Sequence, residues 1–315
     1  MNSIVSRFAG PGVWAWAGAV LLCILALSVM GLDGAPGLAR AGLAFAGCYV
    51  LVGVGQMLVI TAGPGNVDLS IPSVMTLAGY LAIGQMQGDD AGLLPGLALG
   101  TLVGLAAGLA NAALIVLARI PPMIATLASG FIVQSVAIAY SRGSTASPAA
   151  SLLEFSIGLW AGVPSVAWVA LAVSGIIGFV LRYATFGRRI EALGQNPRAA
   201  RFSAVPVAST LAAVYAVTGL LAGATGILFA AYSGGASLGM AQDFLLISIA
   251  VVVVGGTNVA GGRASTIGLV GAAAFLYLIV TLLNVLQLSA GLKSILTGVI
   301  IITVIAVSNR PTSAH

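Results

Sequence analysis

Long, almost uninterrupted runs of apolar residues dominate this chain and alternate with short polar connections. A helix needs about 20 residues to cross the roughly 30 Å of hydrocarbon in a bilayer, and ten runs approach that length. They cover residues 13–32, 39–60, 70–88, 93–117, 122–140, 164–182, 209–232, 244–259, 266–287 and 291–307. We therefore predict an all-α, polytopic transmembrane protein of ten spans that forms a single domain over residues 1–315.

The composition narrows the class further. Of 315 residues, 60% are hydrophobic and 6% are charged, whereas a soluble domain averages about 25% charged residues. That excludes an ordinary cytosolic enzyme, a disordered regulator and a secreted disulfide scaffold, and Cys23 and Cys48 lie in apolar runs as packed, inert thiols would. An outer-membrane barrel is excluded as well, because its strands would alternate apolar and polar positions over about ten residues.

The charges predict an orientation. If the N-terminus is cytoplasmic and ten spans follow, nine of the twelve basic residues lie inside, as the positive-inside rule requires. These nine are Arg7, Arg119, Arg182, Arg188, Arg189, Arg198, Arg201, Arg263 and Arg310. Five of the seven acidic residues, Asp33, Asp89, Asp90, Glu154 and Asp243, fall outside. We therefore expect both termini in the cytoplasm and residues 13–32 to be a retained span rather than a signal peptide, since that run is longer than a usual signal core.

The chain lacks the residues that most catalytic chemistry needs. His315 is its single histidine and Lys293 its single lysine, and no G-x-x-x-x-G-K-[ST] loop, metal-ligand spacing or Ser-His-Asp set is present. We therefore predict no enzyme activity and no metal or cofactor in this chain. Twelve scattered basic residues form no stripe for nucleic acid. A path lined by Ser, Thr, Asn, Gln and Tyr would suit a neutral, hydroxylated solute.

Five of the twelve basic residues gather in the stretch 182–201, RYATFGRRIEALGQNPRAAR. Its pattern predicts two short amphipathic helices broken at Asn196 and Pro197, because Asn favours the N-cap and Pro the first helical turn. A solvated loop would explain the arginines alone. A docking element for a cytoplasmic partner would also explain the small apolar residues, with alanine and leucine at its centre and Arg and Glu191 on its rim.

Two further stretches break the apolar pattern. Residues 61–72, TAGPGNVDLSIP, are either a cytoplasmic turn that Asp68 caps or broken backbone beside a solute path, since such backbone survives at membrane depth only within protein or beside water. Residues 252–265, VVVGGTNVAGGRAS, are either a simple loop or a tight bend against the docking element. The glycines spaced by four, Gly100, Gly104, Gly108, Gly219 and Gly223, predict close helix packing.

Four stretches resemble the permease subunits of bacterial ABC importers of the ribose, xylose and autoinducer-2 type. They read GPGNVDLSIPSVMTLAGY (63–80), IPPMIATLASGFI (120–132), FGRRIEALGQNPRAARFSAV (186–205) and VVVGGTNVAGGRAS (252–265). The most specific motif is A-x-G-x-N-P-x-A-A-R-x-S at 192–203. The resemblance implies a pore in the bacterial inner membrane built with a second permease subunit, identical or different. It also implies an ATPase subunit, which would bind the ATP and Mg, and a periplasmic solute-binding protein.

The resemblance also implies site residues. The cytoplasmic segment 183–208 would couple the permease to the ATPase through Glu191, Ala192, Leu193, Gly194, Gln195, Asn196, Pro197, Arg198, Ala199, Ala200 and Arg201. Asn66, Asp68 and Ser70 would border the path, although Pro64, Asn66 and Pro72 depart from the family's G-G-x-D-L-S-V-G. We expect Glu191→Ala or Gly194→Trp to leave the fold intact and lower coupled ATP hydrolysis. A branched-chain amino acid ABC permease and an ion-coupled secondary transporter are the alternatives.

Overall fold

The computed structural model describes residues 11–31, 35–141 and 146–286, with a few further positions between 289 and 303. Within that part, seven helices are long and apolar enough to cross a membrane, which confirms an all-α polytopic membrane protein. They are α2 (Pro11–Met30), α3 (Ala35–Thr61), α5 (Leu93–Val116), α6 (Pro122–Ser141), α8 (Ser165–Tyr183), α11 (Val207–Tyr232) and α13 (Thr266–Val285).

Two predicted spans are shorter than the apolar runs that contain them. Helix α4 covers Ile71–Met86 and α12 covers Phe244–Val254, because glycine and turn residues end each helix early. The tenth run, 291–307, lies mostly outside the described residues, so the count of ten spans stays a prediction.

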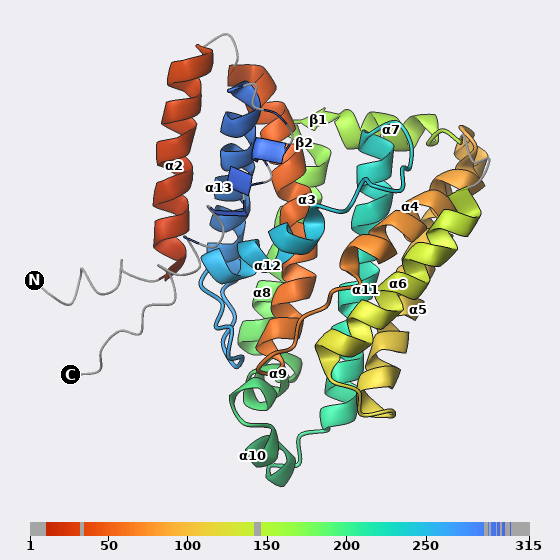
Figure 1. Cartoon of the computed structure of the whole chain (residues 1–315), viewed down its shortest axis with the longest axis vertical. Coiled ribbons are helices and arrows are strands. Elements are labelled where there is room, and N and C mark those ends of the chain that lie inside the picture. The colour runs from red at the N-terminus through yellow and green to blue at the C-terminus, as the bar shows by residue number, and fades with distance from the viewer. Residues whose placement is uncertain are drawn as a thin grey trace, which may run out of the picture.

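The remaining elements lie at the two ends of the bundle (Figure 1). A 3-10 turn η2 (Asp90–Gly92), helix α7 (Ala150–Ile157) and a two-stranded hairpin occupy one end. In the hairpin, β1 (Leu159–Trp160) pairs antiparallel with β2 (Val163–Pro164). Helices α9 (Thr185–Gln195) and α10 (Pro197–Phe202) project from the opposite end.

Helices α3 and α11 form the centre of the bundle, and glycines set the approach between α11 and α5. A side chain on Gly104 would collide with the backbone carbonyl of Gly219, and one on Gly108 would collide with that of Tyr215. Since the two backbones are in direct contact, these positions tolerate only glycine. The predicted packing role of the spaced glycines is confirmed.

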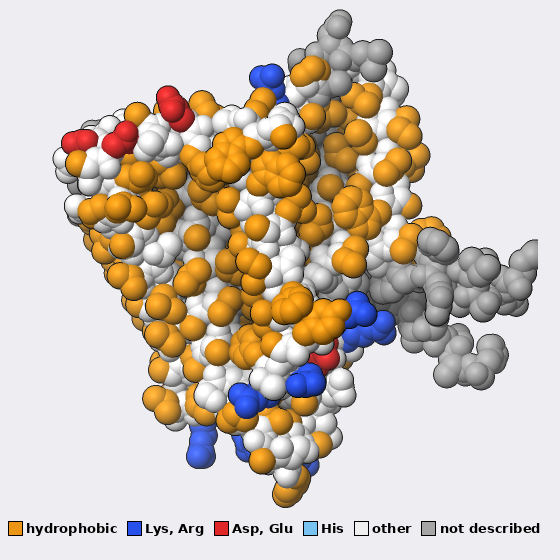
Figure 2. Space-filling model, turned by 180° about the vertical axis from the view of Figure 1, so that it is seen from behind, with side chains coloured by type: hydrophobic (Ala, Val, Ile, Leu, Met, Phe, Trp, Pro, Cys, Tyr) orange, Lys and Arg blue, Asp and Glu red, His pale blue; other side chains and the backbone are white. Residues whose placement is uncertain are grey.

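Most charged side chains are sorted by sign between the two ends of the molecule, although one basic group is seen at the end that carries most of the acidic ones (Figure 2). Exposed Asp89, Asp90 and Glu154 lie around η2 and α7, which we call the acidic end. Exposed arginines, among them Arg188 and Arg198, lie around α9 and α10, which we call the basic end. The orientation predicted from the sequence requires most basic residues on one side of the membrane and most acidic residues on the other.

Two segments without helix enter the bundle from opposite ends (Figure 1). The basic-end segment, residues 62–70, runs from the lower end of α3 to the start of α4 near mid-height. The acidic-end segment, residues 233–243, drops from the upper end of α11 to the start of α12. Helices α4 and α12 therefore start inside the bundle rather than at its ends.

Candidate functional site

Helices α9 and α10 form where the sequence predicts two short helices. The side chain of Asn196 caps α10, because its Oδ1 accepts hydrogen bonds from Arg198 N at 3.0 Å and Ala199 N at 3.1 Å. Pro197 occupies the first turn, where a backbone N–H is not needed. The two helices therefore meet in a rigid turn at Asn196.

The apolar face of α9 packs on the chain itself. Ile190 is fully buried in the main core and Leu193 is 2% exposed. Gly194 touches the backbone of Thr61 and Gly262 so closely that any side chain there would collide with both. An amphipathic helix beside an apolar bundle buries its apolar stripe on that bundle. The expectations that leucine forms the centre of a partner contact and that Gly194→Trp spares the fold are therefore wrong.

The turn between α9 and α10 is the exposed part of this region. Residues 195–199 and Arg201 are exposed, and Phe202 is 93% exposed. Glu191 and Ala192 are half-buried, and Ala200 is buried. We call residues 195–199, Arg201 and Phe202 the docking turn. Its exposed aromatic ring among arginines matches the composition that protein interfaces favour.

The glycine-rich bend at 255–265 holds the docking turn to the bundle. Gly262 N donates a hydrogen bond to Thr61 O at 2.9 Å, and Gln195 Nε2 donates one to Gly262 O at 3.3 Å. Gly261 and Gly262 adopt positive φ angles of 88° and 76°, which L side chains rarely adopt. The bend thus packs against the docking element, as one of the two interpretations of 252–265 predicts.

Asp68 lies inside the bundle rather than in a solvated turn. It is 2% exposed, and its Oδ1 accepts hydrogen bonds from Ser70 N at 2.9 Å and Ser70 Oγ at 2.6 Å. Its backbone N donates to Gln56 Oε1 of α3 at 3.3 Å. The interpretation of 61–72 as a plain cytoplasmic turn is therefore wrong. Asn66 is only half-buried and makes no side-chain bond to this group among the described contacts.

Helices α5 and α6 extend this polar cluster. Asn111 Nδ2 donates to Ser70 Oγ at 2.8 Å, and Ser129 Oγ donates to Asn111 Oδ1. Thr126 Oγ1 accepts from Leu69 N at 3.1 Å and contacts Val67 O at 3.1 Å. The basic-end segment is consequently tied to α3 and α5 by buried hydrogen bonds and to α6 by half-buried ones.

Comparison with known proteins identifies the family. A family model described as "Branched-chain amino acid transport system / permease component" matches residues 38–305. The ribose import permease protein RbsC of Escherichia coli (strain K12) is 32% identical over 265 residues, 82% of each chain. The chain belongs to this family of transport permeases. The autoinducer 2 import system permease protein LsrD is 30% identical in Yersinia enterocolitica, over 85% of this permease and 82% of the relative. No solved structure matches the permease.

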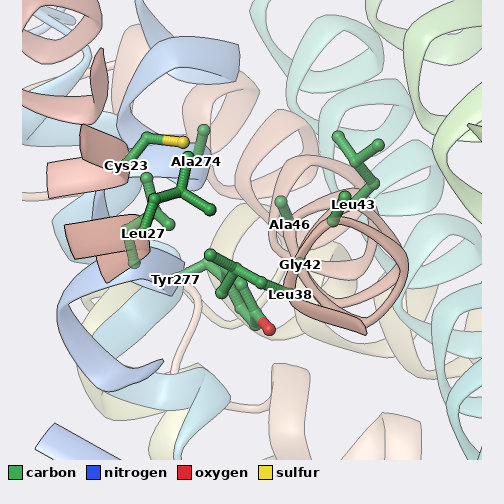
Figure 3. A pocket seen from close by; sticks show the side chains of 10 residues that line it. Cys23, Leu27, Leu38, Gly42, Leu43, Ala46, Ala274 and Tyr277 are labelled. Carbon is green, nitrogen blue, oxygen red and sulfur yellow. The ribbon is translucent and has the colours of Figure 1, made fainter. Parts of the chain in front are cut away.

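Two cavities in the permease are apolar. One of about 330 Å³ lies between α2, α3 and α13, where Cys23, Leu38 and Tyr277 line it among other apolar side chains (Figure 3). Another of about 340 Å³ lies between α5 and α11 and is lined mainly by alanine, leucine and valine. Neither offers the several polar groups that a hydroxylated solute needs. No group of three potential metal ligands occurs in the described ranges.

Sequence reasoning missed most members of the polar cluster around Asp68 and Ser70 in this permease. Gln56, Asn111, Thr126 and Ser129 are buried polar residues within predicted spans 39–60, 93–117 and 122–140. Polar side chains within a span face the protein interior and find partners there. A search for polar residues within each apolar run would have found these four, although not which of them meet.

Proposed function

We propose that this permease is the membrane-spanning subunit of an ABC importer that carries a monosaccharide or a similar small hydroxylated solute inward. The family match over residues 38–305 carries the transport function. The names of the relatives, which import ribose and autoinducer 2, support a sugar-like solute. The absence of a P-loop from the sequence requires ATP and Mg to be bound by another subunit.

The proposal places the basic end in the cytoplasm and the acidic end in the periplasm. The positive-inside rule supports this orientation, with both termini cytoplasmic and the protein in the bacterial inner membrane. A periplasmic solute-binding protein then delivers the solute at the acidic end. A second permease subunit, identical or different, completes the pore.

The docking turn is the proposed contact with the ATPase. Its residues are exposed and available for contact, and the ring of Phe202 is 93% exposed. The exposed residues are Gln195, Asn196, Pro197, Arg198, Ala199 and Arg201. The buried residues Leu193, Gly194 and Ala200 hold the docking turn on the bundle and do not contact the ATPase themselves. Glu191 and Ala192 lie at the edge of the contact.

Backbone contacts provide a route from the docking turn to the path. Gly194 and Gly262 both meet Thr61, the last residue of α3, which directly precedes the basic-end segment. ATP-driven movement of the docking turn would therefore displace residues 62–70, which include Asn66, Asp68 and Ser70. We propose that this segment borders the path and moves during alternating access between outward-open and inward-open states.

Charge reversal at the docking turn tests this proposal. Arg201→Glu should lower solute-stimulated ATP hydrolysis of the purified importer at least tenfold, because it opposes a contact between the subunits. Arg119→Glu is the matched control, since Arg119 is an exposed arginine in the connection between α5 and α6. ATP hydrolysis and co-purification of the ATPase are measured in lipid nanodiscs. Equal ATPase binding and hydrolysis in both variants would contradict the proposed docking.

Two alternatives remain distinguishable by transport assays. The description of the family favours a branched-chain amino acid as the solute, in which case uptake of labelled leucine should exceed uptake of every sugar tested. The buried carboxyl of Asp68 favours an ion-coupled secondary transporter. Proton uncouplers would abolish uptake by such a transporter while cellular ATP is held constant, and uptake by an ABC importer would persist.

A further inference from the structure

We propose that the acidic-end segment forms part of the wall of the solute path, where Ser237, Gln242 and Asp243 bind hydroxyl groups of the solute. This inference rests on the proposed import of a hydroxylated solute. It assigns the solute contact to the segment that enters the bundle from the end opposite to the segment of Asp68.

Two contacts place the segment below the acidic end of the helices. Gln134 Nε2 of α6 donates to Leu238 O at 3.4 Å. A side chain on Gly79 of α4 would collide with Met240, so these two residues are in contact. Gln134 and Gly79 each lie seven residues from the acidic end of their helix, a depth of about 10 Å at 1.5 Å per residue. The segment therefore lies within the bilayer region rather than above it.

The end of the segment lies deeper in the bundle. The ring of Phe244 packs 5.4 Å from that of Tyr49, which is near the middle of α3, and 5.1 Å from that of Phe229 of α11. Ala241 is fully buried. Asp243 immediately precedes Phe244, so its backbone is held at this depth by packing on both sides.

The segment is divided into a buried apolar part and an exposed polar part. Ala241 and Phe244 are buried, and Met240 is half-buried. Ser237, Gln242 and Asp243 are exposed, and Asp243 makes no capping hydrogen bond to α12. A carboxylate facing hydrocarbon at the centre of a span costs about 2.5–3.5 kcal/mol. Such a surface is stable at this depth when it faces water, as the wall of a solute path does.

The polar groups suit a neutral polyol. The Asp243 carboxylate accepts hydrogen bonds from adjacent hydroxyls, and the Gln242 amide both donates and accepts. No lysine or arginine occurs in residues 71–86, 122–141, 207–232 or 233–254, which lie next to this surface. Arg40 of α3 is nine residues from Tyr49, about 14 Å along the helix, toward the acidic end. A zwitterionic amino acid would find no cationic side chain there for its carboxylate. The surface therefore favours a sugar over an amino acid as the solute.

Cysteine accessibility tests the assignment in intact cells that express the whole importer. Cys23 and Cys48 are first replaced by alanine, and Gln242→Cys and Asp243→Cys are made singly. The probe is a membrane-impermeant, cationic methanethiosulfonate added from outside. The matched controls are Leu246→Cys on α12 and Ile132→Cys on α6, whose parent side chains are 59% and 65% exposed and apolar. Because only a thiol in contact with water ionises and reacts, positions 242 and 243 should react at least tenfold faster than both controls.

The outcomes separate the path from its alternatives. Reaction at 242 and 243 no faster than at the controls would overturn the inference, since the segment would then face lipid or a closed interface. Protection of position 243 by a monosaccharide from a panel of pentoses and hexoses supports a hydroxylated solute. Protection by leucine alone, or by no solute, would overturn the assigned contact. Labelling needs no ATPase, so fast labelling without co-purifying ATPase would reject the proposed importer and retain the path.

Discussion

The two segments without helix make a natural comparison, because each carries one aspartate into the bundle from an opposite end. In the basic-end segment, Asp68 is 2% exposed and accepts two hydrogen bonds from Ser70. In the acidic-end segment, Asp243 is exposed and makes no capping bond. One segment is tied to three helices by buried and half-buried polar contacts, and the other presents its polar groups outward.

This difference separates two tasks of a transporter. A segment held by buried hydrogen bonds resists deformation and can transmit displacement, and Thr61, which directly precedes the basic-end segment, touches both α9 and the bend at Gly262. A segment with exposed polar groups at membrane depth can bind a solute. We infer that the basic-end segment responds to the docking turn and that the acidic-end segment contacts the solute.

The largest expected effect comes from adding a methyl group where the basic-end segment is anchored. Gly194→Ala would force its Cβ into the backbone of Thr61 and Gly262, so we expect a loss of about 3 kcal/mol of stability, the upper range for overpacking. Gly235→Ala in the acidic-end segment is the control, because its Cβ would meet its nearest neighbour, Ala146 O, at 3.7 Å. Thermal unfolding in detergent measures both variants.

The two glycine variants also test the comparison as a whole. Gly235→Ala should stay within about 0.5 kcal/mol of the parent, as most substitutions do when they create no clash. Equal losses in both variants would show that the two segments are packed alike. The proposed division between a rigid segment and an accessible one would then fail.

Much of the fold could be predicted from sequence, because apolar length and glycine spacing are local signals. The seven long helices, the break at Asn196 and the close packing at Gly104 are each read from a few neighbouring residues. The boundaries of α4 and α12 could not be predicted in this way. Their apolar runs continue into the glycine and turn residues that end each helix, Gln87 and Gly88 after α4 and Gly255 and Gly256 after α12, and the run alone does not mark where the helix stops.

The contacts within the candidate site were even harder to predict from sequence than the helix boundaries. Sequence reasoning singled out Asp68 and Ser70, which meet in the structure, but Asn111 of α5 is 41 residues away from Ser70 along the chain. Asp243 was assigned to an external loop, yet its neighbour Phe244 packs against Tyr49 in the middle of α3. Depth within the bilayer depends on how a segment folds back, which a single sequence does not record.

Replacement of each aspartate by leucine gives the next largest contrast. Asp68→Leu removes the acceptor of the Ser70 N–H and hydroxyl, and leaving buried donors unpaired costs about 1–3 kcal/mol. Asp243→Leu should change stability by less than about 0.5 kcal/mol if the side chain faces water. Thermal unfolding of the two variants and of Asp68→Asn, which retains an acceptor oxygen, measures the contrast.

The direction of the Asp243→Leu change is informative in itself. A carboxylate against lipid would be unfavourable by about 2.5 kcal/mol or more, so leucine there would raise stability clearly. A raised melting temperature would therefore place Asp243 against hydrocarbon and remove it from the path. Partial recovery by Asp68→Asn relative to Asp68→Leu would confirm that the buried hydrogen bonds stabilise the basic-end segment.

The smallest contrast concerns α6, which binds both segments. Thr126 accepts a hydrogen bond from Leu69 N of the basic-end segment, and Gln134 donates a longer bond of 3.4 Å to Leu238 O of the acidic-end segment. Thr126→Val keeps the shape but leaves the half-buried amide of Leu69 without its acceptor, so we expect a loss of about 1–2 kcal/mol. Gln134→Met should cost about 0.5 kcal/mol, because its bond is the longer of the two. Unfolding of the two single variants and the double variant tests this order. A larger loss at Gln134 than at Thr126 would mean that the acidic-end segment is the more firmly held of the two, and the two proposed roles would have to be exchanged.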